Sequence, residues 1–427
     1  MTTPAQLSAR DKTLELPFVP ASQGNNGYDI SKLLASTGDT TFDIGFANTA
    51  VCKSAITYID GDAGVLQYRG YPIEQLAEKS SFLETSYLVL YGELPTAAQL
   101  DDFTEKISHH MVIDERLREL FRIFPRRSHP MPVLSAAITA LSTFSTDTIG
   151  FEQDKIDAAT HRLLAKVPTL AAYSFKNSIG SPTLWPDYSL SYIENFLRMS
   201  FGSVTGPYEF DDEITRALDV LLILHADHEQ NCSTSTVRLV GSSQANLYAS
   251  VSAGVHALSG PLHGGANQAV LEMLKDIRDR GLSVQDYVGK VKDKSSNERL
   301  MGFGHRIYKN YDPRAAIIKK HADAILRKRE GNDQLLDIAL ELEEAALSDP
   351  YFVERKLYPN VDFYTGLIYQ AMGFPVDMFT VLFAIGRLPG WIAQWREMVN
   401  DPTNKIGRPR QIYVGETQRD YVAVSQR

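Results

Sequence analysis

The chain has 427 residues, of which 44% are hydrophobic and 22% charged, and its formal net charge is -9. This is enough apolar sequence for a large core, in a chain that is long for a single domain. A globally basic footprint is absent, so we do not expect nucleic acid as a partner. An anionic small substrate is compatible with an acidic chain, because a few converging arginines outweigh the net charge locally.

Cysteine usage and apolar patterning indicate the compartment. Cys52 and Cys232 are far apart and form no CxxC pair, as is usual in a reducing environment. The N-terminus lacks the apolar run of a secretory signal. The longest apolar stretch, residues 376–395, contains Asp377 and Arg387 and is interrupted at residues 386–390. This pattern predicts a buried helix, a break and a second helix rather than a membrane span, so we expect a cytoplasmic protein without a membrane partner.

The predicted elements begin with a polar segment and short strands. Residues 1–50 are rich in Thr, Ser, Gly and Asp, and β-like runs follow at residues 55–59 and 65–69 around a turn at residues 61–64. From Ile73 onward, apolar residues recur at spacings of three and four, while strand-like runs almost disappear. This predicts a mainly α fold, with helical periodicity at residues 73–77, 83–90, 133–141, 156–172 and 214–224.

Two further segments differ in composition. Residues 244–258 are rich in small residues, which favours tight helix packing and is also compatible with a subunit interface. The segment 266–376 is more charged and is interpreted as a second, smaller helical domain. The predicted organisation has four parts. Residues 1–50 form a β-containing N-terminal segment, and residues 51–265 form the first part of a large helical domain. Residues 266–376 form a small helical domain, and residues 377–427 form the C-terminal part of the large domain.

The first candidate site is the turn GPLHGGAN, residues 260–267. Gly260 and Pro261 end the small-residue helix, and helical periodicity resumes at Ala269, so His263 is predicted just before a helix N-terminus. The positive end of a helix favours a neutral imidazole, whose N–H is a suitable donor to a developing enolate oxygen. A hydrogen-bonded structural histidine is the alternative.

The second candidate is the glycine-containing stretch of residues 302–314. It places His305 beside two glycines, followed by Arg306, Lys309 and Arg314. This composition suits an anion, and Arg314 could clamp a carboxylate with two parallel hydrogen bonds. The Gly-x-Gly pattern is a weak phosphate signal here, because no strand precedes it. The alternative is a solvated basic loop.

Two further clusters carry titratable side chains. Asp362, in PNVDFYTG, is a lone carboxylate among apolar neighbours, where burial raises a carboxyl pKa towards that of a useful base. Its alternative role is the N-cap of a helix over residues 363–372. His225 and His228, in HADHEQN, have the spacing of a metal pair, but further ligands are not evident, so pocket-lining polar residues are favoured over a metal site.

Together these clusters resemble the citrate synthase family. Residues 302–314 fit the family signature at every position, and HADHEQN, GPLHGGAN and PNVDFYTG resemble its other motif blocks in the family's order. The resemblance runs from about Thr41 to Tyr421. It implies a nearly all-α fold with a large and a small domain that close over the substrates.

The resemblance also implies roles for individual residues. Asp362 would remove a proton from the methyl group of acetyl-CoA, His263 would hydrogen-bond the thioester oxygen, and His305 would hydrogen-bond the oxaloacetate carbonyl. His228, Arg314 and Arg387 match oxaloacetate-binding positions. Arg408 resembles an arginine supplied by the neighbouring subunit, which makes a homodimer the minimum active unit. The product would be citrate, after hydrolysis of citryl-CoA in this first step of the tricarboxylic acid cycle. No metal and no cofactor are implied beyond coenzyme A as part of the substrate.

The N-terminal extension and length are similar to the bacterial type II form, a hexamer built from dimers. In that form a separate site binds NADH, and His110, Arg162 and Lys166 resemble parts of it. However, Ser145 stands where that site has a Tyr, and Thr205 where it has a Cys. We therefore predict weak or absent NADH inhibition.

The sequence leaves three alternative functions open. The nearest is 2-methylcitrate synthase, which uses propionyl-CoA, because one methylene gives only about 1–3 kcal/mol of discrimination in an apolar pocket. The second is a metal-dependent hydrolase built on His225, His228 and His263. The third is a non-catalytic sensor of coenzyme A or a carboxylate, although a sensor has no need of Asp362 as a base.

Overall fold

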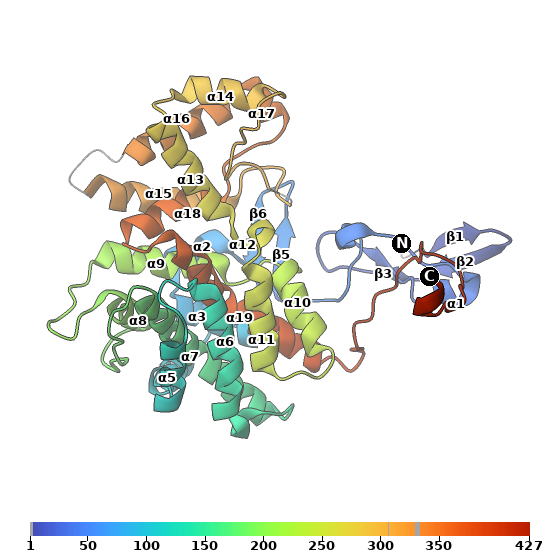
Figure 1. Ribbon diagram of the computed structural model, residues 1–427, viewed down its shortest axis with the longest axis horizontal. Coiled ribbons are helices and arrows are strands. Elements are labelled where there is room, and N and C mark those ends of the chain that lie inside the picture. The colour runs from blue at the N-terminus through green and yellow to red at the C-terminus, as the bar shows by residue number, and fades with distance from the viewer. Residues whose placement is uncertain (1–2, 306, 329–333) are drawn as a thin grey trace. The chain divides into compact units, whose positions relative to one another are not determined.

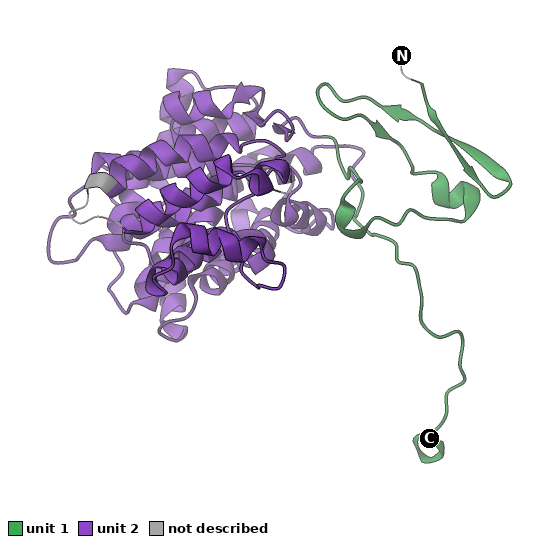
Figure 2. Cartoon of the chain, turned by 90° about the horizontal axis from the view of Figure 1, so that it is seen from above, with its two compact units in different colours: residues 1–53, 405–427 green, residues 54–404 purple. Residues whose placement is uncertain are grey.

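The computed structural model describes residues 3–305, 307–328 and 334–427. The chain divides into two compact units, one formed by Met1–Lys53 with Lys405–Arg427 and the other by Ser54–Asn404 (Figure 2). All the candidate residues except Arg408 belong to the second unit. Arg306 lies outside the described residues.

The first unit contains short antiparallel strand pairs. Strand β1 (Ala5–Ala9) pairs with β2 (Lys12–Leu16), with Ala5 opposite Leu16, and β3 (Phe18–Val19) pairs with β4 (Gly27–Tyr28). The short helices α1 (Leu33–Thr37) and η1 (Ile44–Phe46) follow. The C-terminal arm, residues 405–427, is exposed along its length and ends with η5 (Val424–Gln426). The predicted β-containing N-terminal segment is confirmed.

The second unit begins with an antiparallel sheet in the order β5 (Thr57–Asp60), β6 (Val65–Tyr68) and β7 (Tyr71–Pro72). These strands confirm the β-like runs predicted around residues 55–59 and 65–69. The rest of the unit is helical, as the periodicity predicted. Its helices are α2 (Ile73–Lys79), α3 (Phe82–Tyr91), α4 (Ala97–His109), α5 (Glu115–Ile123), α6 (Pro130–Leu141), η2 (Ser142–Phe144), η3 (Thr146–Thr148), α7 (Gln153–Ser178), α8 (Tyr192–Phe201), α9 (Asp212–His225), α10 (Cys232–Gly241), α11 (Leu247–Leu258), α12 (Pro261–Gly264), α13 (Ala266–Asp279), α14 (Val284–Lys292), α15 (Pro313–Lys328), α16 (Gln334–Ser348), α17 (Pro350–Glu354), α18 (Val361–Ala371), η4 (Val376–Met378) and α19 (Phe379–Val399).

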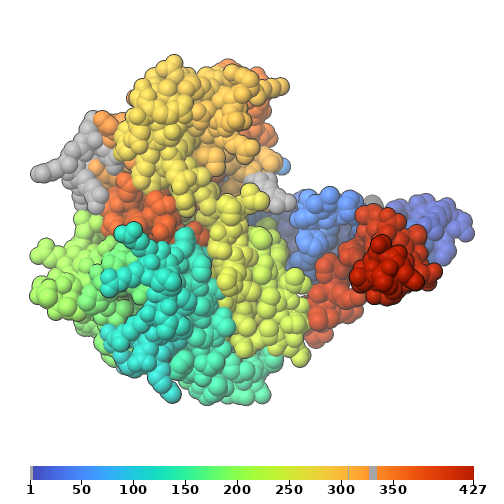
Figure 3. Space-filling view, viewed as in Figure 1, coloured from blue at the N-terminus to red at the C-terminus, as the bar shows by residue number. Residues whose placement is uncertain are grey.

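Helices of the charged segment gather on one side of this unit. In Figure 1, α13, α14, α16 and α17 lie together, away from α5, α6, α7 and α8, and the same grouping covers one end of the unit in the space-filling view (Figure 3). Helix α16 packs against α13, α14 and α17. Because α13 and α15 also pack on α18, and α15 packs on α9, these helices stay within one compact unit with the rest. The division into large and small domains at residues 266 and 376 stays a prediction.

The small-residue helix α11 is tightly packed, as one of its two interpretations predicts. Ser252 lies 2.8 Å from both Ser135 Oγ and Thr139 Oγ1 of α6, inside the core. A Cβ added to Gly254 would come within 2.6 Å of Val237 on α10. Small side chains therefore let α6 and α10 approach α11 closely.

The predicted break at residues 386–390 is wrong, because α19 continues through Pro389. The glycines there serve packing. A Cβ on Gly386 would lie 2.9 Å from His225 Cβ, and one on Gly390 only 2.1 Å from the carbonyl oxygen of Ala226. Tertiary packing thus overrides local helix propensity. Within the described residues, Val376–Val399 is the one helix long and apolar enough to cross a membrane by length and composition, and 83% of its apolar window is buried. Such burial is typical of a core helix, as the sequence predicted.

Candidate active site

Histidine 263 lies where the sequence predicts, in the single turn α12 directly before α13. Its Nε2 accepts a hydrogen bond from the Ser233 backbone N–H at 3.2 Å and lies 2.8 Å from Ser233 Oγ. Because an amide N–H can only donate, Nε2 carries no proton, and the proton of the neutral ring sits on Nδ1. Burial, followed by the charge of Arg387, lowers the pKa of His263 to about 4. His263 is therefore a neutral Nδ1–H donor at physiological pH.

Histidine 305 is the opposite tautomer. Its Nδ1 accepts hydrogen bonds from the backbone N–H groups of Ile307 at 3.0 Å and Tyr308 at 3.2 Å. The proton of the neutral ring is therefore on Nε2. Burial, followed by the nearby charge of Arg314, lowers the pKa of His305 to about 4. The site thus contains two neutral imidazole donors, each held in one tautomer by main-chain amides.

The glycines beside His305 shape the loop. Gly302 and Gly304 have φ angles of +77° and +73°, a left-handed conformation that favours glycine. The loop pairs with the segment that leads into α18: Gly304 N–H donates to Tyr358 O at 2.7 Å, and Asn360 N–H donates to Gly302 O at 2.9 Å. Asn360 Nδ2 also donates to Gly304 O at 2.9 Å. The loop of His305 and the start of the helix that carries Asp362 are therefore one hydrogen-bonded structure.

Aspartate 362 is the second residue of α18, but it does not cap that helix. The N-cap is Asn360, whose Oδ1 accepts the Asp362 backbone N–H at 3.0 Å, so the alternative N-cap role of Asp362 is wrong. Burial raises the pKa of the Asp362 carboxyl to about 6, against the opposing charge of Arg314. A carboxylate with a pKa near 6 is largely ionised at neutral pH and is still a stronger base than an ordinary Asp.

The two buried arginines are placed differently. Arg314 forms a bidentate ion pair with Asp312, with Nε–Oδ1 and Nη2–Oδ2 distances of 3.0 and 2.9 Å. Burial works against its charge, but Asp312 outweighs burial and raises the Arg314 pKa. Arg387, 1% exposed, donates from Nε to His225 O at 2.6 Å, while its Nη1 has no partner among the described residues. Burial lowers the Arg387 pKa to about 10, so the guanidinium remains charged at pH 7.

Histidine 228 lies beside Tyr308 and His305. Its Nε2 lies 3.3 Å from Tyr308 Oη, and its ring centroid is 5.4 Å from that of His305. Burial, and then the charge of Arg314, hold the pKa of His228 well below its usual value. Asp362 lies within electrostatic range of both Arg314 and Arg387, and the same arginines act on His305 and His263, respectively. Two cations and three neutral histidines around one carboxylate base suit one dianionic substrate and a second substrate that loses a carbon-bound proton.

The metal interpretation is contradicted by the geometry. His225 donates from Nδ1 to Leu221 O at 2.6 Å within α9. Within the part of the chain that the structure describes, His, Cys, Asp and Glu side chains do not gather in groups of three or more that could hold a metal ion. His225, His228 and His263 therefore do not form the three-histidine site of a metal-dependent hydrolase.

Sequence reasoning missed two contributors and could not place a third. Ser233 acts through its main-chain N–H, which no side-chain motif reveals. Asp312 was visible as the Asp of Asp-Pro-Arg, but its bond to Arg314 appears only in three dimensions. Arg408 lies in the exposed C-terminal arm, which belongs to the other compact unit.

Comparison with known proteins agrees with this geometry. Residues 45–410 match the family model described as the C-terminal domain of citrate synthase. Citrate synthase 1 of Mycobacterium tuberculosis (strain ATCC 25618 / H37Rv) is 62% identical over 97% of this chain and 96% of its own length. Citrate synthase of Corynebacterium glutamicum (strain ATCC 13032) is 57% identical, over 97% and 95%.

Solved structures show the same fold. Citrate synthase from Pyrobaculum aerophilum is 38% identical and superimposes with a TM-score of 0.83, covering 90% of this chain and 95% of that one. The citrate synthase of Thermoplasma acidophilum, solved with carboxymethyl coenzyme A and oxaloacetate, is 31% identical, with a TM-score of 0.81 and coverages of 89% and 98%. By sequence, by fold and by the residues gathered at its site, the chain belongs to the citrate synthase family.

Proposed function

We propose that this enzyme condenses acetyl-CoA with oxaloacetate through Asp362, His263 and His305, and then hydrolyses citryl-CoA to citrate and coenzyme A. The observation that carries the proposal is the combination of charge states in one site. A carboxylate with a raised pKa accompanies two imidazoles that are neutral and fixed in opposite tautomers. Such a site can remove a carbon-bound proton and stabilise negative charge on two oxygens, that of the thioester and that of the ketone.

The first step uses Asp362 and His263 together. Asp362 removes a proton from the methyl carbon, and the electron pair moves onto the thioester oxygen, which accepts the hydrogen bond from His263 Nδ1–H. A carboxylate alone is too weak a base to populate a thioester enolate, so the two groups act simultaneously.

The second step joins the substrates. The nucleophilic methylene carbon attacks the oxaloacetate ketone carbon while His305 Nε2–H donates a hydrogen bond to the ketone oxygen. That oxygen gains one proton to become the citrate hydroxyl, which balances the proton that Asp362 removed from the methyl group, and His305 ends the step neutral. Asp312 occupies Nε and Nη2 of Arg314, which leaves Nη1 for a substrate carboxylate. Arg387 Nη1 and His228 complete the oxaloacetate site. Water then cleaves the thioester and releases the coenzyme A thiol. Coenzyme A is part of the substrate, and the atoms balance without an electron donor or acceptor.

The alternative substrate, propionyl-CoA, is not favoured, because the curated relatives named above are citrate synthases. An apolar pocket rejects one extra methylene by only about 1–3 kcal/mol, so slow turnover of propionyl-CoA is compatible with the proposal.

The active assembly in this proposal is at least a homodimer in which Arg408 enters the neighbouring subunit's site, and the complete assembly is a hexamer in the cytoplasm. Supporting this, the C-terminal arm is exposed throughout and carries large apolar side chains that a partner surface would cover. They are Ile406, Ile412, Tyr413, Val414 and Tyr421.

The test is thiol release from acetyl-CoA with and without oxaloacetate, for the wild type and Asp362→Ala, with propionyl-CoA in parallel. We expect oxaloacetate-dependent release that is lost in the variant and is much slower with propionyl-CoA. Faster release with propionyl-CoA would favour 2-methylcitrate synthase. No release from folded wild type would leave a binding protein only and overturn the proposal.

A further inference from the structure

The β5–β6 hairpin touches both loops that carry the oxaloacetate histidines. We infer that this hairpin sets the spacing of His228 and His305, with Thr57 and Gly61 as its positioning residues. The inference rests on the proposed function and goes beyond it, because neither residue belongs to the candidate site.

The first contact fixes the loop of His228. Thr57 Oγ1 on β5 donates to Asp227 Oδ2 at 2.6 Å, and the Asp227 side chain is fully buried. On the other side of His228, the Ile59 main chain of the same strand favours the charged form of the Glu229 carboxylate, although burial raises the pKa of Glu229 to about 7. Glu229 has a φ of +51°, a conformation that a non-glycine residue rarely adopts without support. The residue before His228 is thus hydrogen-bonded to β5, and the residue after it lies within electrostatic range of the same strand.

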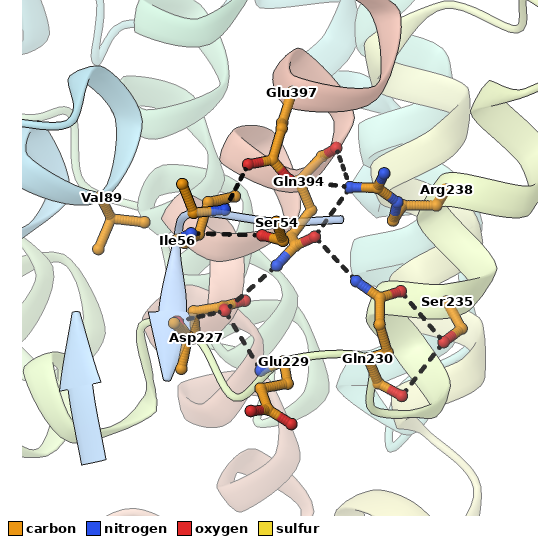
Figure 4. Close-up of polar contacts among 12 residues, drawn as sticks. Ser54, Ile56, Val89, Asp227, Glu229, Gln230, Ser235, Arg238, Gln394 and Glu397 are labelled. Atoms are coloured by element: carbon orange, nitrogen blue, oxygen red, sulfur yellow. Dashed lines mark hydrogen bonds and ion pairs between the residues drawn. The ribbon is translucent and has the colours of Figure 1, made fainter. Parts of the chain in front are cut away.

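A buried polar network reinforces this anchor (Figure 4). Asp227 Oδ2 also accepts Glu229 N–H and Gln394 Nε2, both at 3.3 Å. Gln394 Oε1 in turn accepts Arg238 Nη1 at 3.0 Å. Glu397, one turn further along α19 from Gln394, accepts the N–H of Ala55 at 2.9 Å. Because each member is held by others, the residues leading into β5 and the loop of His228 are tied to the same helix, α19.

The second contact fixes the loop of His305. Gly61, in the β5–β6 turn, accepts Lys309 N–H on its carbonyl oxygen at 2.7 Å. A Cβ on Gly61 would lie only 2.2 Å from the carbonyl oxygen of Ile307. That carbonyl belongs to the same peptide group as the Tyr308 N–H, which donates to His305 Nδ1. The turn therefore lies directly against the peptide that orients the His305 ring, with no room for a side chain at position 61.

The consequence is that one hairpin sets the gap between the two rings. Thr57 of the hairpin binds Asp227, next to His228, and Gly61 binds Lys309, in the loop of His305. Tyr308 Oη of that second loop lies 3.3 Å from His228 Nε2. Displacement of catalytic groups by about 1 Å can cost on the order of a hundredfold in rate. The hairpin is thus expected to govern oxaloacetate binding more than acetyl-CoA binding.

The experiment compares Gly61→Ala, Thr57→Val and Thr57→Ser with the wild type. Gly206→Ala is the matched control, because its Cβ would meet open space and its φ is not left-handed. Each variant is measured for oxaloacetate binding by titration calorimetry, for both KM values and kcat, and for its thermal midpoint.

We expect Gly61→Ala to weaken oxaloacetate binding about tenfold or more, from displacement of the Ile307 peptide. Thr57→Val should weaken it about fivefold, the effect of one hydrogen bond, whereas Thr57→Ser should restore it because the hydroxyl is kept. The KM for acetyl-CoA and the behaviour of Gly206→Ala should stay near wild type.

Unchanged oxaloacetate binding in folded Gly61→Ala would overturn the inference, as would equal weakening of both substrates. If Gly61→Ala does not fold, the Thr57→Val and Thr57→Ser pair decides by the same readouts. Calorimetry tests the proposed function and the hairpin inference separately. If the wild type binds oxaloacetate but shows no turnover, the proposed function is wrong, whereas the hairpin inference is still decided by oxaloacetate binding in the variants.

Discussion

Burial acts in opposite directions on the carboxyl and imidazole groups of this site, since it disfavours whichever form is charged. It raises the pKa of Asp362 to about 6 and lowers those of His263 and His305 to about 4. A base and two neutral hydrogen-bond donors therefore coexist at pH 7 within one set of side chains.

The acid limb of the pH–rate profile should belong to Asp362. The base must be ionised, so kcat/KM should fall tenfold per pH unit as the pH drops below about 6, once Asp362 is protonated. The histidines, already neutral, should not contribute above pH 5. Measuring this apparent pKa at several temperatures identifies the group, because carboxyl ionisation has almost no enthalpy whereas imidazole ionisation has a large one. A strongly temperature-dependent pKa would assign the limb to a histidine and contradict this account.

Sequence motifs could predict which side chains form the site, because their chemistry is visible residue by residue. They could not predict main-chain partners. The tautomers of His263 and His305 are set by amides of Ser233, Ile307 and Tyr308, whose positions depend on how distant loops meet. For the same reason the cap of α18 was assigned to Asp362 as an alternative, although Asn360 holds that position.

At the scale of the element, α19 shows why glycines and a proline predicted a break that does not exist. Local helix propensity is weak compared with the packing of a fully buried helix. Gly386 and Gly390 have no side chain, which leaves room for the end of α9 to pack against α19. Elements with regular periodicity, such as α7 and α9, were predictable because their apolar spacing needs no knowledge of neighbours.

Gly390→Ala should therefore destabilise the protein by about 2 kcal/mol or more, because its Cβ would lie 2.1 Å from Ala226 O. The control is Gly289→Ala in α14, where a Cβ meets open space and helix propensity should add about 0.5–1 kcal/mol of stability. Urea unfolding measures both. Equal stability of the two variants would contradict the packing role of Gly390.

The two cationic side chains of α7 that resemble part of an NADH site already have partners within the protein. Arg162 is held by Asp147 through two bonds of 2.6 Å, and Lys166 donates to the carbonyl oxygens of His110 and Val112. The cations that would hold a phosphate are thus occupied within the protein. We expect initial rates to be insensitive to micromolar NADH, and saturable inhibition in that range would refute this.

At the scale of the whole molecule, the resemblance predicts a site shared between subunits. Seven residues were proposed for the site, and only Arg408 lies in the other compact unit. In the proposed dimer, Arg408 would enter the site of the partner subunit.

Complementation tests this sharing. Arg408→Ala and Asp362→Asn should each be inactive alone, but mixed dimers should contain one complete site, so random reassociation should restore about a quarter of wild-type activity. Mixing after mild dissociation and assaying thiol release measures it. Failure to regain activity, with mixed dimers shown by mass spectrometry, would place Arg408 in its own subunit's site or outside any site.

The central claim, that Asp362 and His263 enolise acetyl-CoA before His305 acts on the second substrate, is tested most directly by methyl-proton exchange. Acetyl-CoA is incubated in D₂O with malate, a dicarboxylate that fills the oxaloacetate site but lacks its ketone, and deuterium uptake is followed by NMR. The account predicts exchange by the wild type and by His305→Gln, and none by Asp362→Asn or His263→Ala. Exchange that persists in Asp362→Asn, or that disappears in a His305→Gln variant that still binds malate, would contradict it.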